Sequence, residues 1–214
     1  MRIIKLARGL YQIKAEKKEL GMAFLRLQEY YESVKFKGKI FSVEEFKAYW
    51  KKTKLGRKSG KFSYCQYFDG FNIPSKVLRP FYDGKFNPLT KWEKQILRQL
   101  KKIKEKKFYI IGTRNNGSQE LFKHELAHSL FHSNHSYKMR VKRVLKKLDK
   151  KSKMKLDRYL KDIDYHPAVM EDERHAYLLA GKDDLKDARI SIQKIQPVAV
   201  ELDRIFSSTI KMLI

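Results

Sequence analysis

Residues 124–128 read His-Glu-Leu-Ala-His, a pattern whose residue types and spacing are suited to metal chemistry. On an α-helix, His124 and His128 lie one turn apart on the same face, so both imidazoles can reach one metal ion. Glu125 lies just off that face, where its carboxylate can take a proton from a metal-bound water instead of binding the metal. All six histidines fall between residues 124 and 175, which concentrates this chemistry in one segment.

A short strand and a turn precede the motif. Residues 108–113, Phe-Tyr-Ile-Ile-Gly-Thr, have the apolar and β-branched composition of a buried strand. Residues 115–118, Asn-Asn-Gly-Ser, break the chain and offer an N-cap. Residues 121–131 contain neither proline nor glycine. The sequence therefore predicts a strand, a turn and then a helix that carries both histidines.

A catalytic zinc site usually has three protein ligands and one open position for water, so a third ligand is needed. His132 is one turn beyond His128, but a straight helix cannot wrap three residues over two turns around one tetrahedral ion. Residues 171–173, Glu-Asp-Glu, lie in an otherwise apolar helix predicted over residues 168–180. Carboxylates in such a helix need a partner, which a metal supplies. We therefore expect the third ligand to come from this acidic cluster.

The two histidine positions followed by a downstream helix with Glu-x-x-Ala, here residues 173–176, resemble the gluzincin class of zinc metallopeptidases. The nearest types are the ImmA/IrrE-like and Ste24-like peptidases. The resemblance covers roughly residues 108–181 and implies a zincin-like core with a short β-sheet beside the histidine-bearing helix. It also implies Zn²⁺ held by His124, His128 and Glu173, with Glu171 as the alternative to Glu173. The activity that it implies is hydrolysis of a peptide or protein substrate.

The expected mechanism assigns Glu125 as the general base that deprotonates a metal-activated water and then carries the proton to the leaving amine. The oxyanion that forms on the substrate needs a donor besides the metal. His175 and Tyr177 are the predicted catalytic residues for this role, and His166 and Tyr165 are the alternatives.

The rest of the chain predicts an α+β fold that is mostly helical. Residues 1–107 form a helical and aromatic region of unassigned role, with capping boxes that start helices after Ser42 and Thr90. Residues 108–181 form the metal-binding core. Residues 182–214 form a tail whose amphipathic helix is expected to begin after Pro197 and to pack on the body.

The chain carries a net charge of +25, with 49 lysines and arginines, which favours association with a polyanion such as nucleic acid. Residues 140–161 hold 11 of these cations, and we predict there a helix or helix pair with a break near Ser152. Its expected outward residues are Arg143, Lys146, Lys147, Lys150 and Lys151. Two alternatives remain: the charge only solvates the surface, or the protein is a nucleic-acid- or ribosome-associated protein with a structural or inactive zinc site.

The sequence also predicts a cytoplasmic protein without a membrane span. No apolar stretch is long enough to cross a bilayer, and the N-terminus lacks the apolar region of a signal peptide. Cys65 is the only cysteine, so it cannot form an internal disulfide, and we expect it to be a small core residue.

Overall fold

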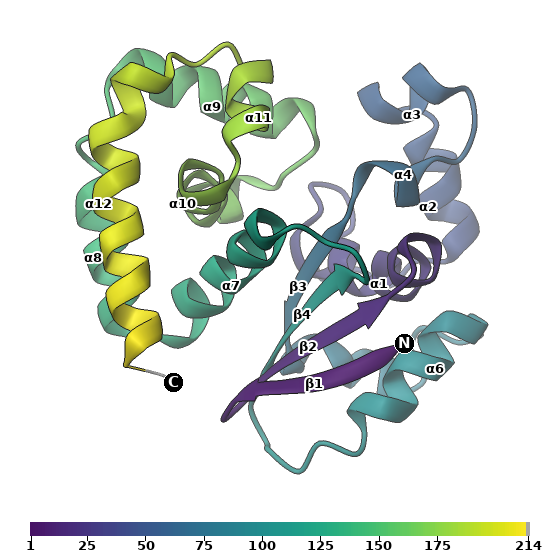
Figure 1. Cartoon of the computed structure of the whole chain (residues 1–214). Helices are drawn as coiled ribbons and strands as arrows, with labels where there is room; N and C mark the ends of the chain where they lie inside the picture. The colour runs from purple at the N-terminus through teal and green to yellow at the C-terminus, as the bar shows by residue number, and fades with distance from the viewer. Residues whose placement is uncertain (213–214) are drawn as a thin grey trace. The chain divides into compact units, whose positions relative to one another are not determined.

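The computed structural model describes residues 1–212, with only the backbone described at residue 182. The fold is α+β and mostly helical, as predicted (Figure 1). The chain divides into two compact units, Met1–Gly117 and Ser118–Ile214. Within the described part of the chain, none of the helices combines the length and the apolar character needed to cross a bilayer.

The first unit is built on a four-stranded mixed sheet. Its strands are β1 (Arg2–Ala7), β2 (Leu10–Ala15), β3 (Gly70–Pro74) and β4 (Tyr109–Arg114), in the order β1-β2-β4-β3. β2 and β4 are parallel, and the two outer pairings are antiparallel. Five of the six residues of β4 are buried, as expected for a strand with a neighbour on each side.

Helices and short helical turns cover this sheet. They are α1 (Lys17–Glu32), α2 (Val43–Trp50), α3 (Lys54–Ser59), α4 (Tyr64–Tyr67), η1 (Ser75–Leu78), α5 (Arg79–Tyr82) and α6 (Lys91–Leu100). The predicted capping boxes at Ser42 and Thr90 are confirmed, since each side chain accepts a hydrogen bond from the backbone N–H three residues on. These caps begin α2 and α6.

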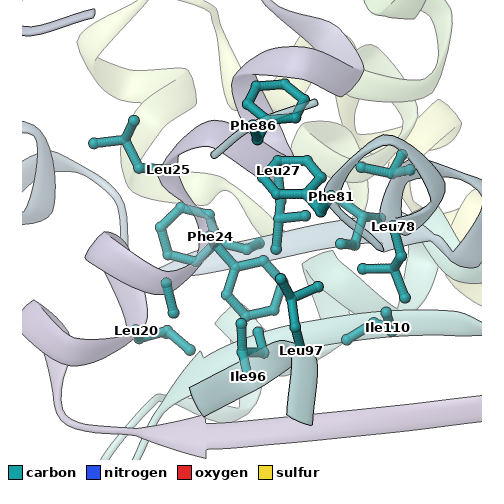
Figure 2. Packing of buried hydrophobic residues seen from close by; sticks show 14 of the residues in the cluster. Leu20, Phe24, Leu25, Leu27, Leu78, Phe81, Phe86, Ile96, Leu97 and Ile110 are labelled. Carbon is teal, nitrogen blue, oxygen red and sulfur yellow. The ribbon is translucent and has the colours of Figure 1, made fainter. Parts of the chain in front are cut away.

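The core of the first unit lies between α1, α6 and the sheet, where Leu20, Phe24, Ile96, Leu97 and Ile110 meet (Figure 2). Gly112 on β4 makes the close contact between α1 and the sheet possible. A Cβ atom there would lie 2.8 Å from the Phe24 ring, so any larger residue would push the helix away. Glycine in the middle of this strand is therefore a packing requirement.

The described elements of the second unit are helices. It contains α7 (Gln119–Ser133), α8 (His135–Leu145), α9 (Lys150–Asp162), η2 (Pro167–Val169), α10 (Met170–Ala180), α11 (Lys182–Asp187) and α12 (Ile192–Lys211). α10 contacts α7, α8, α9, α11 and α12, so it is the central helix of this unit (Figure 1). A central position explains why α10 is mostly apolar although it carries three acidic residues in its first turn.

The structure corrects several boundaries. β4 pairs with β2 and β3 and so lies in the first unit, separate from the helix with the two histidines, and the C-terminal helix belongs to the second unit. The break in the basic tract falls between Leu145 and Lys150, because Asp149 caps α9 by accepting from the N–H of Ser152. α12 begins at Ile192, ahead of Pro197, so the predicted start was wrong.

Candidate metal centre

The two histidines of the motif lie on α7, as the spacing predicts. Ser118 caps this helix by accepting a hydrogen bond from the N–H of Leu121. The Nε2 atoms of His124 and His128 face each other across 3.2 Å. Two nitrogens bound to one tetrahedral zinc, each at about 2.0–2.1 Å, would be separated by ~3.3 Å. The histidine pair therefore has the separation that a shared metal requires.

Glu173 joins this pair from α10, which packs against α7. Its Oε2 lies 3.6 Å from Nε2 of His128, and ligand atoms of the three side chains all lie within 4.8 Å of one another. His128 and Glu173 are buried and His124 is partly buried. Glu171, the alternative ligand, instead forms an ion pair of 2.7 Å with Lys142. Two imidazole nitrogens and a carboxylate oxygen form a donor set that suits zinc.

Glu125 follows His124 on α7, and this residue is 4% exposed. It is close enough to His128 for its charge to contribute to raising the pKa of that imidazole. A buried carboxylate next to a metal-binding pair is the arrangement expected of a general base that does not bind the metal itself.

Asp172 is a part of the site that the sequence prediction missed. Its Oδ1 lies 3.0 Å from Nδ1 of His128, on the opposite side of the ring from the ligand atom. A carboxylate in this position favours the tautomer with hydrogen on Nδ1 and leaves the Nε2 lone pair free for a metal. In the sequence, Asp172 lies between Glu171 and Glu173, the two predicted ligand candidates, in a helix otherwise rich in apolar residues. This position is the sequence feature that could have identified Asp172 as part of the site.

At His128 and Asp172, burial and the neighbouring charges act in opposite directions. Burial lowers the pKa of His128, but Asp172 and Glu173 outweigh it and hold this pKa well above its ordinary value, so a bound metal would displace a proton from this imidazole. Burial raises the pKa of Asp172, yet His128 and His175 bring it down to about 2. Burial and the neighbouring His128 lower the pKa of His124 far below its ordinary value, so this imidazole is neutral and able to act as a ligand.

His175 occupies a different place from the one predicted. Its side chain is fully buried, its ring stacks on Phe131, and its Nε2 shares a hydrogen bond of 2.6 Å with the hydroxyl of Tyr137. Its Nδ1 lies 3.7 Å from Oδ1 of Asp172. Both nitrogens of His175 are therefore directed at interior groups, one of them at Asp172. In this position His175 cannot donate a hydrogen bond to a substrate oxyanion.

Tyr177 lies against His124, one of the candidate metal ligands. Its ring meets the ring of His124 edge-on, with centroids 4.9 Å apart. Burial and the charge of Glu173 raise the pKa of its hydroxyl well above the ordinary value, and Tyr165 is a hydrogen-bond partner. Tyr177 therefore stays protonated and remains available as a donor.

The remaining histidines are not part of this group. His166 accepts a hydrogen bond of 3.0 Å from the N–H of Ala168 and so caps η2. His132 and His135 are exposed near the end of α7 and the start of α8. Among the described residues, the convergent group consists of His124, His128 and Glu173.

Comparisons with known proteins do not assign the chain to a family. No protein-family model matches it, and neither the curated proteins nor the solved structures give a match. Inferences about function therefore depend on the residues and geometry of the site.

Proposed function

We propose that this protein is a zinc-dependent metallopeptidase that hydrolyses peptide bonds in a peptide or protein substrate. The observation that carries the proposal is the convergence of His124, His128 and Glu173, which come from two helices about 45 residues apart. Glu125 and Tyr177 supply a buried carboxylate and a protonated hydroxyl beside the same group. The three candidate ligands match those that the gluzincin resemblance implies, and Glu125 holds the position expected of the general base.

When bound, zinc would act as a Lewis acid that lowers the pKa of a water and polarises the substrate carbonyl. His124, His128 and Glu173 would hold the ion. Glu125 would take the proton from the attacking water and deliver it to the leaving amine. Tyr177 is the donor best placed to stabilise the developing oxyanion, because its hydroxyl remains protonated and its ring lies against His124.

A structural zinc site is the second candidate function. Such sites are closed by four protein ligands, whereas catalytic sites keep one position open. Only three side chains form the group within the described residues, and the nearby His175 is engaged with Tyr137. The three-ligand arrangement favours the catalytic reading.

The proposal includes a cytoplasmic location. Its support is that Cys65 is the single cysteine of the sequence and cannot form an internal disulfide, as is usual for proteins of a reducing compartment. Cell fractionation with a tagged chain would test this part separately.

The decisive experiment measures zinc content and peptide cleavage in the same protein samples. The wild type, Glu125→Gln and His124→Ala/His128→Ala proteins would be incubated with a diverse peptide mixture and the products identified by mass spectrometry. The wild type should carry about one zinc and cleave, Glu125→Gln should keep zinc but not cleave, and the double-histidine variant should lose both. Cleavage by Glu125→Gln at the wild-type rate, or full zinc occupancy without the histidines, would contradict the proposal.

A further inference from the structure

A concave basic surface lies on α9, which we call the α9 face. It surrounds an open cavity of about 310 Å³ lined by Lys150, Lys151, Met154, Lys155 and Arg158. These positions are spaced by one, three and four residues, which places them on one side of the helix. The apolar residues of the same helix point the other way, since Leu156 and Leu160 are fully buried.

The cations of the α9 face are not neutralised by neighbouring carboxylates. Lys150, Lys151 and Arg158 are exposed, and none of them forms an ion pair with a residue that the structure describes. Lys155 donates a hydrogen bond to the backbone carbonyl of Arg189, which holds its ammonium group at the rim of the cavity. The face therefore presents a fixed cluster of positive charge to solvent.

Two acids of the same segment are already engaged. Asp149 accepts the backbone N–H of Ser152 as the cap of α9. Asp157 pairs with Lys153 at 2.7 Å and with Arg174 at 2.5 Å. Asp149 keeps its negative charge beside Lys150 and Lys151, so the four cations that line the cavity still outnumber it.

Lys150 and Lys151 also lie at the N-terminal end of α9, where the helix dipole favours negative charge. They occupy the first turn of α9, where the unpaired N–H groups carry a partial positive charge, and that turn contains no acidic residue. Lys142 and Arg143 of α8 lie in a last turn, where cations stabilise a helix. The lysines at the start of α9 thus add to a positive region, which suits binding of an anion better than it suits helix stability.

We propose that the α9 face binds the phosphodiester backbone of nucleic acid without reading base sequence. Lysine and arginine contact phosphates, and Met154, which is 58% exposed, provides apolar contact for a sugar or a base. An anionic membrane surface fits less well, because interfacial helices present a broad apolar face and here one exposed methionine interrupts the cations. This activity is separate from the metal centre.

The test compares two charge-reversal variants with identical substitutions. The first variant reverses three charges of the α9 face: Lys150→Glu/Lys151→Glu/Arg158→Glu. Lys51→Glu/Lys52→Glu/Arg57→Glu makes the same change among exposed residues of the first unit. Binding of a fluorescent, mixed-sequence single-stranded oligonucleotide would be followed by anisotropy over a range of salt concentrations. Circular dichroism and zinc content would verify that each variant folds.

The wild type should bind with an affinity that falls steeply with salt, because each phosphate contact releases counterions. The α9 variant should bind at least about tenfold more weakly, and its log–log salt slope should be shallower by about 2, since each single-strand contact contributes about 0.7. The first-unit variant should retain most of the affinity. Equal losses in both variants, absence of binding by the wild type, or α9-dependent binding to phosphatidylserine vesicles but not to the oligonucleotide would overturn the proposal.

Discussion

Asp172 lies 3.0 Å from Nδ1 of His128, and the next residue, Glu173, lies 3.6 Å from Nε2 of the same imidazole. Two adjacent residues of α10 therefore contact both nitrogens of one ring on α7. Asp172 favours one tautomer and orientation of the imidazole, and Glu173 lies on the side of Nε2, the candidate metal-binding atom. The acidic cluster thus has two roles, divided between neighbouring positions.

Asp172→Asn should weaken zinc binding by about 10- to 100-fold, because the amide loses the charge that holds His128 in its ligand tautomer. Competition with a chelator at neutral pH would measure the affinity. Glu171→Gln is the matched control, since Glu171 is on the same helix but pairs with Lys142. Similar zinc affinities for both variants would show that Asp172 does not position His128.

Tyr177→Phe should reduce kcat by about 100-fold, as expected for loss of an oxyanion donor, while zinc content stays unchanged. The substitution keeps the ring that packs on His124. Tyr159→Phe is the control, because the hydroxyl of Tyr159 donates a hydrogen bond of 2.8 Å to Asp184 and not to a candidate metal ligand. A Tyr177→Phe enzyme with normal kcat on a peptide that the wild type cleaves would remove Tyr177 from the mechanism.

Glu93→Gln should destabilise the first unit by about 3–5 kcal/mol, because it leaves Arg26 buried without its counter-charge. Both side chains are almost fully buried, and two hydrogen bonds of 2.5 and 2.6 Å join them. Urea unfolding followed by tryptophan fluorescence reports on this unit alone, since both tryptophans, Trp50 and Trp92, lie in it.

Glu44→Gln provides the reference for that measurement. Glu44 is exposed and pairs with Lys47 on the surface of α2, so its loss should change the free energy of unfolding by less than about 1 kcal/mol. Equal effects of the two glutamine variants would mean that the buried pair does not stabilise the first unit.

Glu105→Gln should reduce the change in the free energy of unfolding of the first unit between neutral and acidic pH. Hydrogen bonds from Lys5 and Tyr11 lower the pKa of Glu105 from its ordinary value of 4.5 to about 2. A lowered folded-state pKa contributes stability that is complete above the unfolded pKa and is lost as pH falls toward about 2. The urea midpoints of wild type and variant should therefore differ at about pH 6 and converge near pH 2. A constant difference across this range would contradict the assignment.

The local elements were predictable because their signals lie within a few residues of one another. The capping boxes at Ser42 and Thr90, the N-cap at Ser118 and the one-turn spacing of His124 and His128 depend on contacts between residues three or four positions apart. β4 was recognisable from its apolar run. The outward positions of Arg143, Lys146, Lys147, Lys150 and Lys151 followed from helical periodicity and are confirmed by their exposure.

Only the tertiary structure decided which residues complete the site. Residues 171–173 and 175 occupy successive positions around α10, so the side of this helix that packs on α7 determines which carboxylate reaches His128. That packing brings Glu173 to the ligand atoms, places Asp172 behind the ring and buries His175 against Tyr137. The membership of β4 in the first unit was equally hidden, because its strand partners are residues 10–15 and 70–74. Such long-range choices depend on the burial of whole helix and strand faces, to which no short stretch of sequence is specific.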